Sequence, residues 1–342
     1  MSLLWIEGGE GFGTSIGVAP TGLDRKYNIK ANINLIDLEA GRTGGIALEM
    51  NGSGVHFQTF PLTTNPTLII GKGLKFPDYP GATTRLLALY DGVTEGVNVR
   101  CKADGEFEVY RANTLLGTTT GAAVGQNNWC HFEIKVVTND TTGSIELRVN
   151  GSAKLTLTSQ DTQAGSNAYH DMVRFLGVAS TGQHIDDIYI CDGSGSANNN
   201  FLGNMKVVGI FPTAEGDTIN FTPSTGTDNS ALVDENPPND DTDYVESSTV
   251  GQKDLYQYGD VSGLGNTIAG LQINTDVRET DASSFSLITV VKSNVTESDS
   301  AASAIGSTSY VTKTRVVAQD PDTSAAWTQA GINAAQFGMK VG

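Results

Sequence analysis

The sequence predicts an all-β protein whose larger part is a sandwich of two packed sheets. Three observations support this fold class. Apolar and polar residues alternate over several short segments, two segments contain strong hairpin turns, and glycine is abundant, with 40 residues in a chain of 342. Because hairpin-connected strands bury their apolar faces only when a second sheet covers them, the pattern favours a sandwich.

The first alternating segment runs from Tyr27 to Leu35, where every second residue is apolar and the residues between are Asn or Lys. This spacing predicts one strand with a buried face and a solvated face. Further strands are predicted at residues 68–70, 86–90, 132–137, 173–178 and 185–190.

Two hairpins are predicted from their turn residues. Residues 97–109 alternate on both sides of Asp104-Gly105, and residues 145–157 alternate on both sides of Asn150-Gly151. Asn-Gly supplies the positive φ angles that a two-residue turn requires.

The length predicts about two domains, since roughly 150 residues form a typical domain. We expect the first to span residues 1–205 and the second, smaller and β-rich, to span residues 206–342. The elements predicted in the second are a strand-like segment at 205–211, an exposed acidic loop at 234–243, strands at 268–273, 285–291 and 310–317, and one or two helical turns within 324–337 that end at Gly338.

The charge balance excludes two classes of partner. The formal net charge is −17 at pH 7, and no stripe of Lys or Arg offsets it in the sequence. Such a chain repels phosphate backbones and anionic lipids, so we expect neither nucleic-acid binding nor attachment to an anionic membrane surface. No run approaches the roughly 18 apolar residues of a membrane span, so we also expect no membrane insertion. Residues 1–18 contain no signal-peptide pattern, and Cys101, Cys130 and Cys191 form no C-x-x-C pair. Synthesis in a reducing cytoplasm is therefore expected.

Three stretches of the first domain resemble the concanavalin A-like, laminin-G-type jelly roll, in the versions found in bacteriophage virion proteins. They are a Trp-led strand at residues 128–136, a Val-Asn-Gly hairpin at residues 146–151 and an Ile-Asp-Asp strand at residues 184–193. They occur in the family's order and cover about residues 1–205. Residues 243–258 and 326–338 are similar to the tails of phage proteins. The resemblance implies a jelly-roll sandwich in a virion component located on the particle.

No active-site motif is recognisable. The E-x-D-x-x-E string of retaining glucanases on this fold is absent, as are the nucleophile elbow and the P-loop. Glu106 and Glu108 share a predicted strand face, but glutamates at alternate positions are ordinary on a solvated strand. We therefore expect no catalytic residues, no bound organic cofactor and no enzymatic activity.

One candidate metal site lies in the Ile-Asp-Asp strand. Asp186, Asp187 and Asp192, together with loop carbonyls, could approach the six or so oxygen ligands that calcium requires. The favoured interpretation is that a buried Asp holds loop N–H groups by hydrogen bonds.

These observations lead to three functional hypotheses. The first is a bacteriophage virion structural protein, acting as a capsid decoration, head fibre or tail-associated adhesion module and assembling with other virion proteins and with copies of itself. The alternative is a lectin-like module that binds a host glycan. A glycan-cleaving enzyme ranks last.

The end of the chain carries the expected assembly residues. Trp327, Ile332 and Phe337 are large apolar side chains in a short terminal segment. They must be buried against their own domain or against a partner, because an exposed apolar patch invites aggregation.

Overall fold

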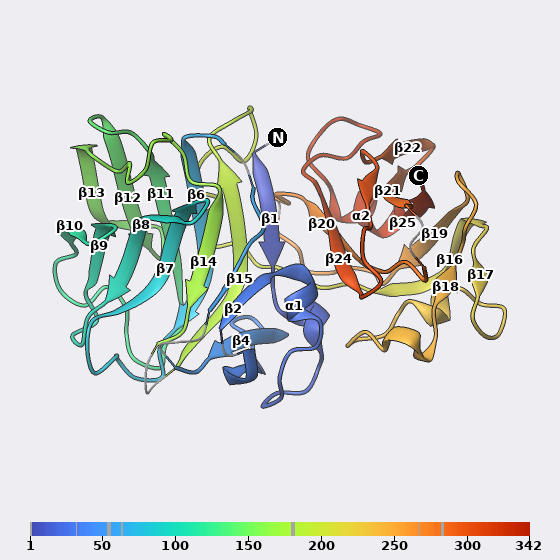
Figure 1. The fold of residues 1–342 in the computed structure, drawn as a ribbon, viewed down its shortest axis with the longest axis horizontal. Coiled ribbons are helices and arrows are strands. Elements are labelled where there is room, and N and C mark those ends of the chain that lie inside the picture. Colours follow the sequence, from blue (N-terminus) through green and yellow to red (C-terminus); the bar gives the residue numbers. More distant parts are fainter. Residues whose placement is uncertain are drawn as a thin grey trace. The chain divides into compact units, whose positions relative to one another are not determined.

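The computed structural model describes residues 2–342 except Asn32, residues 53–55, Thr63, residues 179–181, Asn266 and residues 282–283. The side chains of residues 29–33 and 56 also lie outside this description. The chain divides into two compact units, residues 1–207 and residues 208–342. The expected boundary lay between residues 205 and 206. Each unit is nearly all β, as the sequence predicted (Figure 1).

The first unit is a sandwich of two antiparallel sheets. The eight-stranded sheet has the order β13 (Ser152–Gln160), β12 (Gly143–Val149), β11 (Cys130–Val137), β6 (Thr67–Lys75), β15 (Gln183–Asp192), β4 (Ile46–Met50) and β3 (Ile36–Ala40), and β1 (Leu3–Glu7) also pairs with β15. The seven-stranded sheet has the order β10 (Thr114–Thr118), β9 (Phe107–Arg111), β8 (Thr94–Cys101), β7 (Thr84–Asp91), β14 (Met172–Leu176), β5 (His56–Gln58) and β2 (Asn28–Ala31). The short helix α1 (Leu23–Lys26) precedes β2.

Both predicted hairpins are confirmed. Strands β12 and β13 meet at Asn150-Gly151, whose φ angles of 50° and 76° are those of the tight turn that the sequence indicated. Strands β8 and β9 are joined through Asp104 and Gly105, and Gly105 has a φ of 79°. The two turns fix the register of both hairpins, so the apolar residues of each strand face the other sheet.

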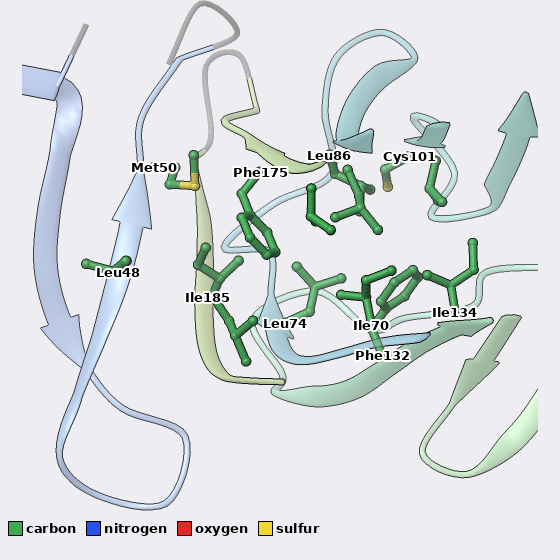
Figure 2. Close-up of a cluster of buried hydrophobic side chains, with 14 of the residues drawn as sticks. Leu48, Met50, Ile70, Leu74, Leu86, Cys101, Phe132, Ile134, Phe175 and Ile185 are labelled. Atoms are coloured by element: carbon green, nitrogen blue, oxygen red, sulfur yellow. The ribbon is translucent and has the colours of Figure 1, made fainter. Parts of the chain in front are cut away.

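The core lies between the two sheets. Figure 2 shows Ile70, Phe132 and Ile134 of one sheet converging with Leu86 and Phe175 of the other. All five side chains are at most 1% exposed. Contacts of this kind along most strands bury one face of each sheet and hold the sandwich together by the hydrophobic effect.

A lysine lies inside this apolar core. Lys72 of β6 pairs in register with Phe132, and its side chain is fully buried. Its Nζ lies 5.9 Å from the ring centre of Phe132 and 5.6 Å from that of Phe175. The Nζ has no hydrogen-bond partner within the described residues, and burial lowers the pKa of Lys72 to about 7.

The prediction of one strand over residues 27–35 is wrong. Strand β2 ends at Ala31, residues 33–35 form a 3₁₀ turn, and β3 begins at Ile36. The break has a topological cause, because β2 belongs to the seven-stranded sheet and β3 to the eight-stranded sheet. A chain that crosses from one sheet to the other cannot keep one face buried throughout, and Leu35 is accordingly 44% exposed.

The second unit contains three sheets. The six-stranded sheet has the order β16 (Pro212–Ile219), β19 (Lys253–Tyr258), β25 (Gln336–Val341), β21 (Ser286–Ser293) and β22 (Thr296–Asp299), and β23 (Ser303–Ala304) also pairs with β21. Two separate ribbons are formed by β17 (Thr222–Pro223) with β18 (Val245–Glu246) and by β20 (Leu271–Val277) with β24 (Val311–Val317). The short helix α2 (Gln329–Ala334) starts at Thr328, whose Oγ1 accepts a hydrogen bond from the Gly331 N–H.

Two expectations for the second unit need correction. Residues 205–211 form no strand, and the predicted helical turns end at Ala334, four residues before Gly338, which lies in β25. Strand β25 is central, because it pairs with both β19 and β21.

The expected assembly residues are core residues of the second unit. Trp327, Ile332 and Phe337 are 3%, 4% and 3% exposed and belong to one apolar cluster of that unit. The Trp327 Nε1 donates a hydrogen bond to the carbonyl of Val317 at 3.1 Å. Burial against their own unit removes these side chains from any docking surface.

Candidate functional site

The outer face of the seven-stranded sheet carries a connected set of arginine, tyrosine and amide side chains. Strand alternation places most of them there, because neighbours in sequence such as Val99, Val109 and Val173 point into the core. A register shift between β7 and β8 brings Glu95 opposite Tyr90. We call this set the arginine face, and it consists of Gln58, Arg85, Tyr90, Glu95, Asn98, Arg100, Tyr110 and Arg174. The guanidinium-bearing side chains are half-buried and lie above a buried polar layer formed by Gln58, Asn98 and Tyr90.

The Arg174 guanidinium of β14 is fixed by contacts with Tyr90 and Gln58. Its guanidinium carbon lies 4.0 Å from the ring centre of Tyr90 on the neighbouring strand β7. Its Nε and Nη2 donate to Gln58 Oε1 at 3.0 and 2.8 Å, and its Nη1 donates to the Tyr90 hydroxyl at 2.8 Å. These bonds fix the guanidinium plane and tie three strands together.

Glu95 is the carboxylate of the arginine face. The Tyr90 hydroxyl donates to its Oε2 at 2.8 Å, and the Asn98 amide donates to its Oε1 at 3.0 Å. The Arg85 Nε lies 3.1 Å from the same Oε1. Burial, followed by the bond to Glu95, raises the pKa of Tyr90 to about 12, so Tyr90 stays a neutral hydrogen-bond donor at physiological pH.

Arg100 of β8 is positioned by three contacts. Its guanidinium carbon lies 3.7 Å from the ring centre of Tyr110, its Nε donates to Asn98 Oδ1 at 2.9 Å, and its Nη2 donates to the Ala112 carbonyl at 3.2 Å. In the strand register Arg100 stands directly opposite Arg85 of β7. Burial and then the nearby Arg85 charge lower the pKa of Arg100.

This arrangement can bind a polar ligand through side chains whose orientation is already set. The stacked guanidinium groups are planar donors, and Glu95 is an acceptor within the same surface. Groups fixed before binding lose little conformational entropy when a ligand arrives.

Sequence reasoning missed this face. The signal is present as Arg and Tyr at the polar positions of the strands that contain residues 85–90, 98–100 and 108–110. Its recognition from sequence requires knowing that β14, distant in the chain, pairs with β7 and adds Arg174.

The candidate calcium residues Asp186 and Asp187 lie on the other sheet and hold an arginine. Asp186 accepts hydrogen bonds from the Arg42 N–H and the Asp187 N–H, both at 2.7 Å. Asp187 forms an ion pair with Arg42 at 2.6 Å and accepts the Val207 N–H at 2.7 Å. Burial, and then the Asp187 charge, raise the pKa of Asp186 to about 7.

Asp192 is engaged separately from this pair. Its Oδ1 accepts the Ser194 N–H at 2.9 Å and the Ser194 hydroxyl at 2.5 Å. Across the described ranges, no group of three or more His, Cys, Asp or Glu side chains is arranged to hold a metal.

A segment that follows β15 covers part of the outer face of the eight-stranded sheet. We call residues 200–207 the strap. Its Gly203 N–H donates to Glu133 Oε1 at 2.9 Å, and its Leu202 N–H donates to the Tyr189 hydroxyl at 3.0 Å. The Tyr189 ring lies over Gly71, where a Cβ would stand 2.1 Å from the ring. The strap therefore closes this part of the sheet by hydrogen bonds to buried side chains.

The Trp-led strand predicted at residues 128–136 begins at Cys130, so Trp129 precedes β11, and its ring lies on this outer face. Its ring contacts His184 and Lys75, which point outward because their strand neighbours Ile185 and Leu74 face the core. The Trp129 ring is half-buried and makes an edge contact with the His184 ring at a centroid distance of 6.2 Å, and the Lys75 Nζ lies 5.4 Å from its centre.

No helix in the part of the chain that the structure describes is long and apolar enough to cross a membrane. No protein-family model matches the chain, and no curated protein matches it.

Several solved structures are similar to part of the chain. A sialidase from Trypanosoma rangeli, in complex with 2,3-difluoro-KDN, matches at 13% identity and a TM-score of 0.33, over 47% of this chain and 29% of that chain. The alginate lyase Aly36B matches at 9% identity and a TM-score of 0.37, over 55% of this chain and 96% of that chain. An endo-β-1,4-glucuronan lyase from Trichoderma reesei matches at 9% identity and a TM-score of 0.35, over 55% and 94%. The chain spans less than a third of the sialidases it matches.

Two predictions from the sequence are wrong in the light of these comparisons. The chain was expected to be a virion structural protein and not an enzyme, whereas the similar structures are glycan-processing proteins, enzymes among them. The lectin-like alternative is closer to them. The matches concern the β-sandwich fold alone, so the ligand has to be inferred from this chain's own residues.

Proposed function

We propose that this protein is a carbohydrate-binding β-sandwich, a jelly roll of the concanavalin A-like kind, whose glycan ligand lies along the arginine face. The observation that supports the proposal most strongly is the connected layer of hydrogen-bonding side chains across β8, β7, β14 and β5. Its guanidinium groups are half-exposed and already oriented by Tyr90, Tyr110 and Gln58.

The chemistry of the face suits a sugar. A glycan presents hydroxyl groups that both donate and accept hydrogen bonds, and Arg100, Arg85 and Glu95 offer donors and an acceptor side by side. These polar groups are fixed on a sheet, a rigid scaffold that keeps their spacing constant.

The face is poorly suited to a protein partner. Stable protein interfaces have an apolar centre, but the apolar residues paired with Arg174 and Tyr90 here, Ala88 and Met172, are only 0% and 9% exposed.

A glycan array with the full chain tests the proposal. We expect binding to a defined set of oligosaccharides, and we expect Arg100→Gln to weaken it at least tenfold. The matched control is Arg148→Gln, an outward arginine of β12 that pairs with Glu146 at 2.7 Å and stacks on Phe201. Chromatography of the bound oligosaccharides after incubation shows whether they are also cleaved.

Binding on the array decides the outcome, once thermal unfolding has confirmed that both variants are folded. If no glycan binds, or if Arg100→Gln and Arg148→Gln bind as well as the unaltered chain, the arginine face is not a glycan site.

A further inference from the structure

We infer that the glycan bound at the arginine face carries carboxylate groups and that Arg85 and Arg100 together hold one of them. This inference rests on the proposed function and specifies the class of ligand. It starts from the position of the two arginines, which stand directly opposite each other on β7 and β8.

Each of the two guanidinium groups retains donor capacity. In Arg85, Nη2 donates to Asn113 Oδ1, while the buried Nε lies 3.1 Å from Glu95 Oε1 and makes no hydrogen bond within the described residues. Arg100 uses Nε with Asn98 and Nη2 with the Ala112 carbonyl. Neither Nη1 atom has a hydrogen-bond partner within the residues that the structure describes. Arg174, in contrast, uses Nε, Nη1 and Nη2 on Gln58 and Tyr90. The donors left for a ligand therefore belong to Arg85 and Arg100.

The charge at this position is unusual for the chain. Like charges directly opposite each other on neighbouring strands are destabilising, and here they occur in a protein whose net charge is −17. Two carboxylates lie near the pair. Glu95 accepts from Tyr90 and Asn98, and Glu108, which stands opposite Arg100 on β9, accepts from the Tyr110 hydroxyl. The lowered pKa of Arg100, caused by burial and by Arg85, agrees with positive charge that the protein neutralises only in part.

A carboxylate fits this pair by geometry. Its two oxygens match the planar fork of a guanidinium group, and charge-assisted hydrogen bonds of this kind are about twice as strong as neutral ones. Residues directly opposite on antiparallel strands have Cβ atoms about 5 Å apart, so one carboxylate can accept from both side chains.

A polyphosphate is a poorer fit than an acidic glycan. Nucleic-acid binding relies on many Lys and Arg contacts to closely spaced phosphates, whereas this face has two arginines with free donors and the chain as a whole is acidic. In an acidic glycan the carboxylates are separated by whole sugar rings, so one pair of arginines is enough to bind each carboxylate.

The test uses matched probes that differ only in charge. Tetramers of galacturonate, mannuronate and glucuronate are each titrated calorimetrically into the full chain, beside their methyl esters. We expect at least one acidic tetramer to bind tenfold or more tightly than its ester. That preference should shrink in high salt and should vanish in Arg85→Gln and Arg100→Gln, while Arg148→Gln keeps it. Arg100→Lys, which keeps the charge without the fork, should restore only part of it.

The possible failures are distinguishable. If acids and esters bind equally, and both depend on Arg100, the glycan site stands and the inference about carboxylates is wrong. If no tetramer binds while neutral glycans bind the array through Arg100, the inference is also overturned. If a single-stranded oligonucleotide binds more tightly than every tetramer through the same arginines, the ligand class is wrong. If nothing binds in either experiment, the proposed function itself fails.

Discussion

Replacing the buried lysine should make the protein more stable. Lys72 is fully buried between Phe132 and Phe175, and its Nζ has no hydrogen-bond partner within the described residues. Burial lowers its pKa from 10.5 to about 7. The difference, at about 1.4 kcal/mol for each pH unit, means that protonation of this lysine favours the unfolded chain by about 5 kcal/mol at pH 7.

The pH dependence follows from the same values. Between pH 7 and pH 10.5 the unfolded chain holds a proton on Lys72 that the folded chain does not, so the free energy of unfolding rises with pH across this window. Below pH 7 both states hold the proton, and this group adds no further slope.

Lys72→Met keeps an unbranched side chain, one atom shorter, and removes the charge. We expect it to raise the free energy of unfolding at pH 7 by about 3–5 kcal/mol, because some of the gain is offset by imperfect packing of the methionine. The variant should also lose most of the rise between pH 7 and pH 10.5. Urea unfolding at several pH values in that window, followed by circular dichroism and tryptophan fluorescence, measures both effects.

The control is Lys154→Met on β13, where the side chain is exposed. It should change stability by less than about 0.5 kcal/mol and leave the pH dependence unaltered. A destabilised Lys72→Met, or an unchanged slope, would show that the lysine is charged and stabilised in the core, and the reasoning would be refuted.

Two further predictions concern the core and the end of the chain. Phe132→Ala should cost about 3–5 kcal/mol of unfolding free energy, since it empties a fully buried site, whereas Trp129→Ala should cost only about 1–2 kcal/mol because its ring is half-buried on the outer face. Chemical denaturation of the two variants measures the difference, and equal costs would place Trp129 in the core after all. Deleting residues 324–342 removes β25 from between β19 and β21, so the second unit should lose its cooperative unfolding transition while residues 1–207 stay protected from proteolysis. A truncated chain that retains two calorimetric transitions would contradict this.

The local part of the fold could be predicted because it depends on neighbouring residues. Asn150-Gly151 fixes its turn by backbone sterics alone, and the alternation on each side of it fixes which residues face inward. The 3₁₀ turn at residues 33–35 could not be predicted in this way, because the alternation of residues 27–35 is uninterrupted and only the pairing partners of β2 and β3 separate the two sheets.

The candidate site was hidden for a related reason. Arg85, Arg100 and Arg174 are ordinary outward residues of separate strands, and they become one site only when β14 returns to pair with β7. The aspartates were conspicuous because Asp186 and Asp187 are adjacent in sequence. In the fold both contact Arg42, which is more than 140 residues away in the sequence. The arginine supplies the positive charge that a bound metal would otherwise provide. Lys72 was equally invisible, since nothing in its neighbours indicates a lysine turned inward.

The strap also has a consequence for how the first unit is made. Every strand of the sandwich has been synthesised once Asp192 leaves the ribosome, but the backbone donors for Glu133, Tyr189 and Asp187 come from Gly203, Leu202 and Val207. At ordinary rates of translation these residues emerge about half a second to three seconds later. During that interval the eight-stranded sheet is complete while part of its outer face is open to water. A nascent chain or a gene fragment that stops at Asp192 therefore contains every strand of the sandwich but lacks the strap that covers this face.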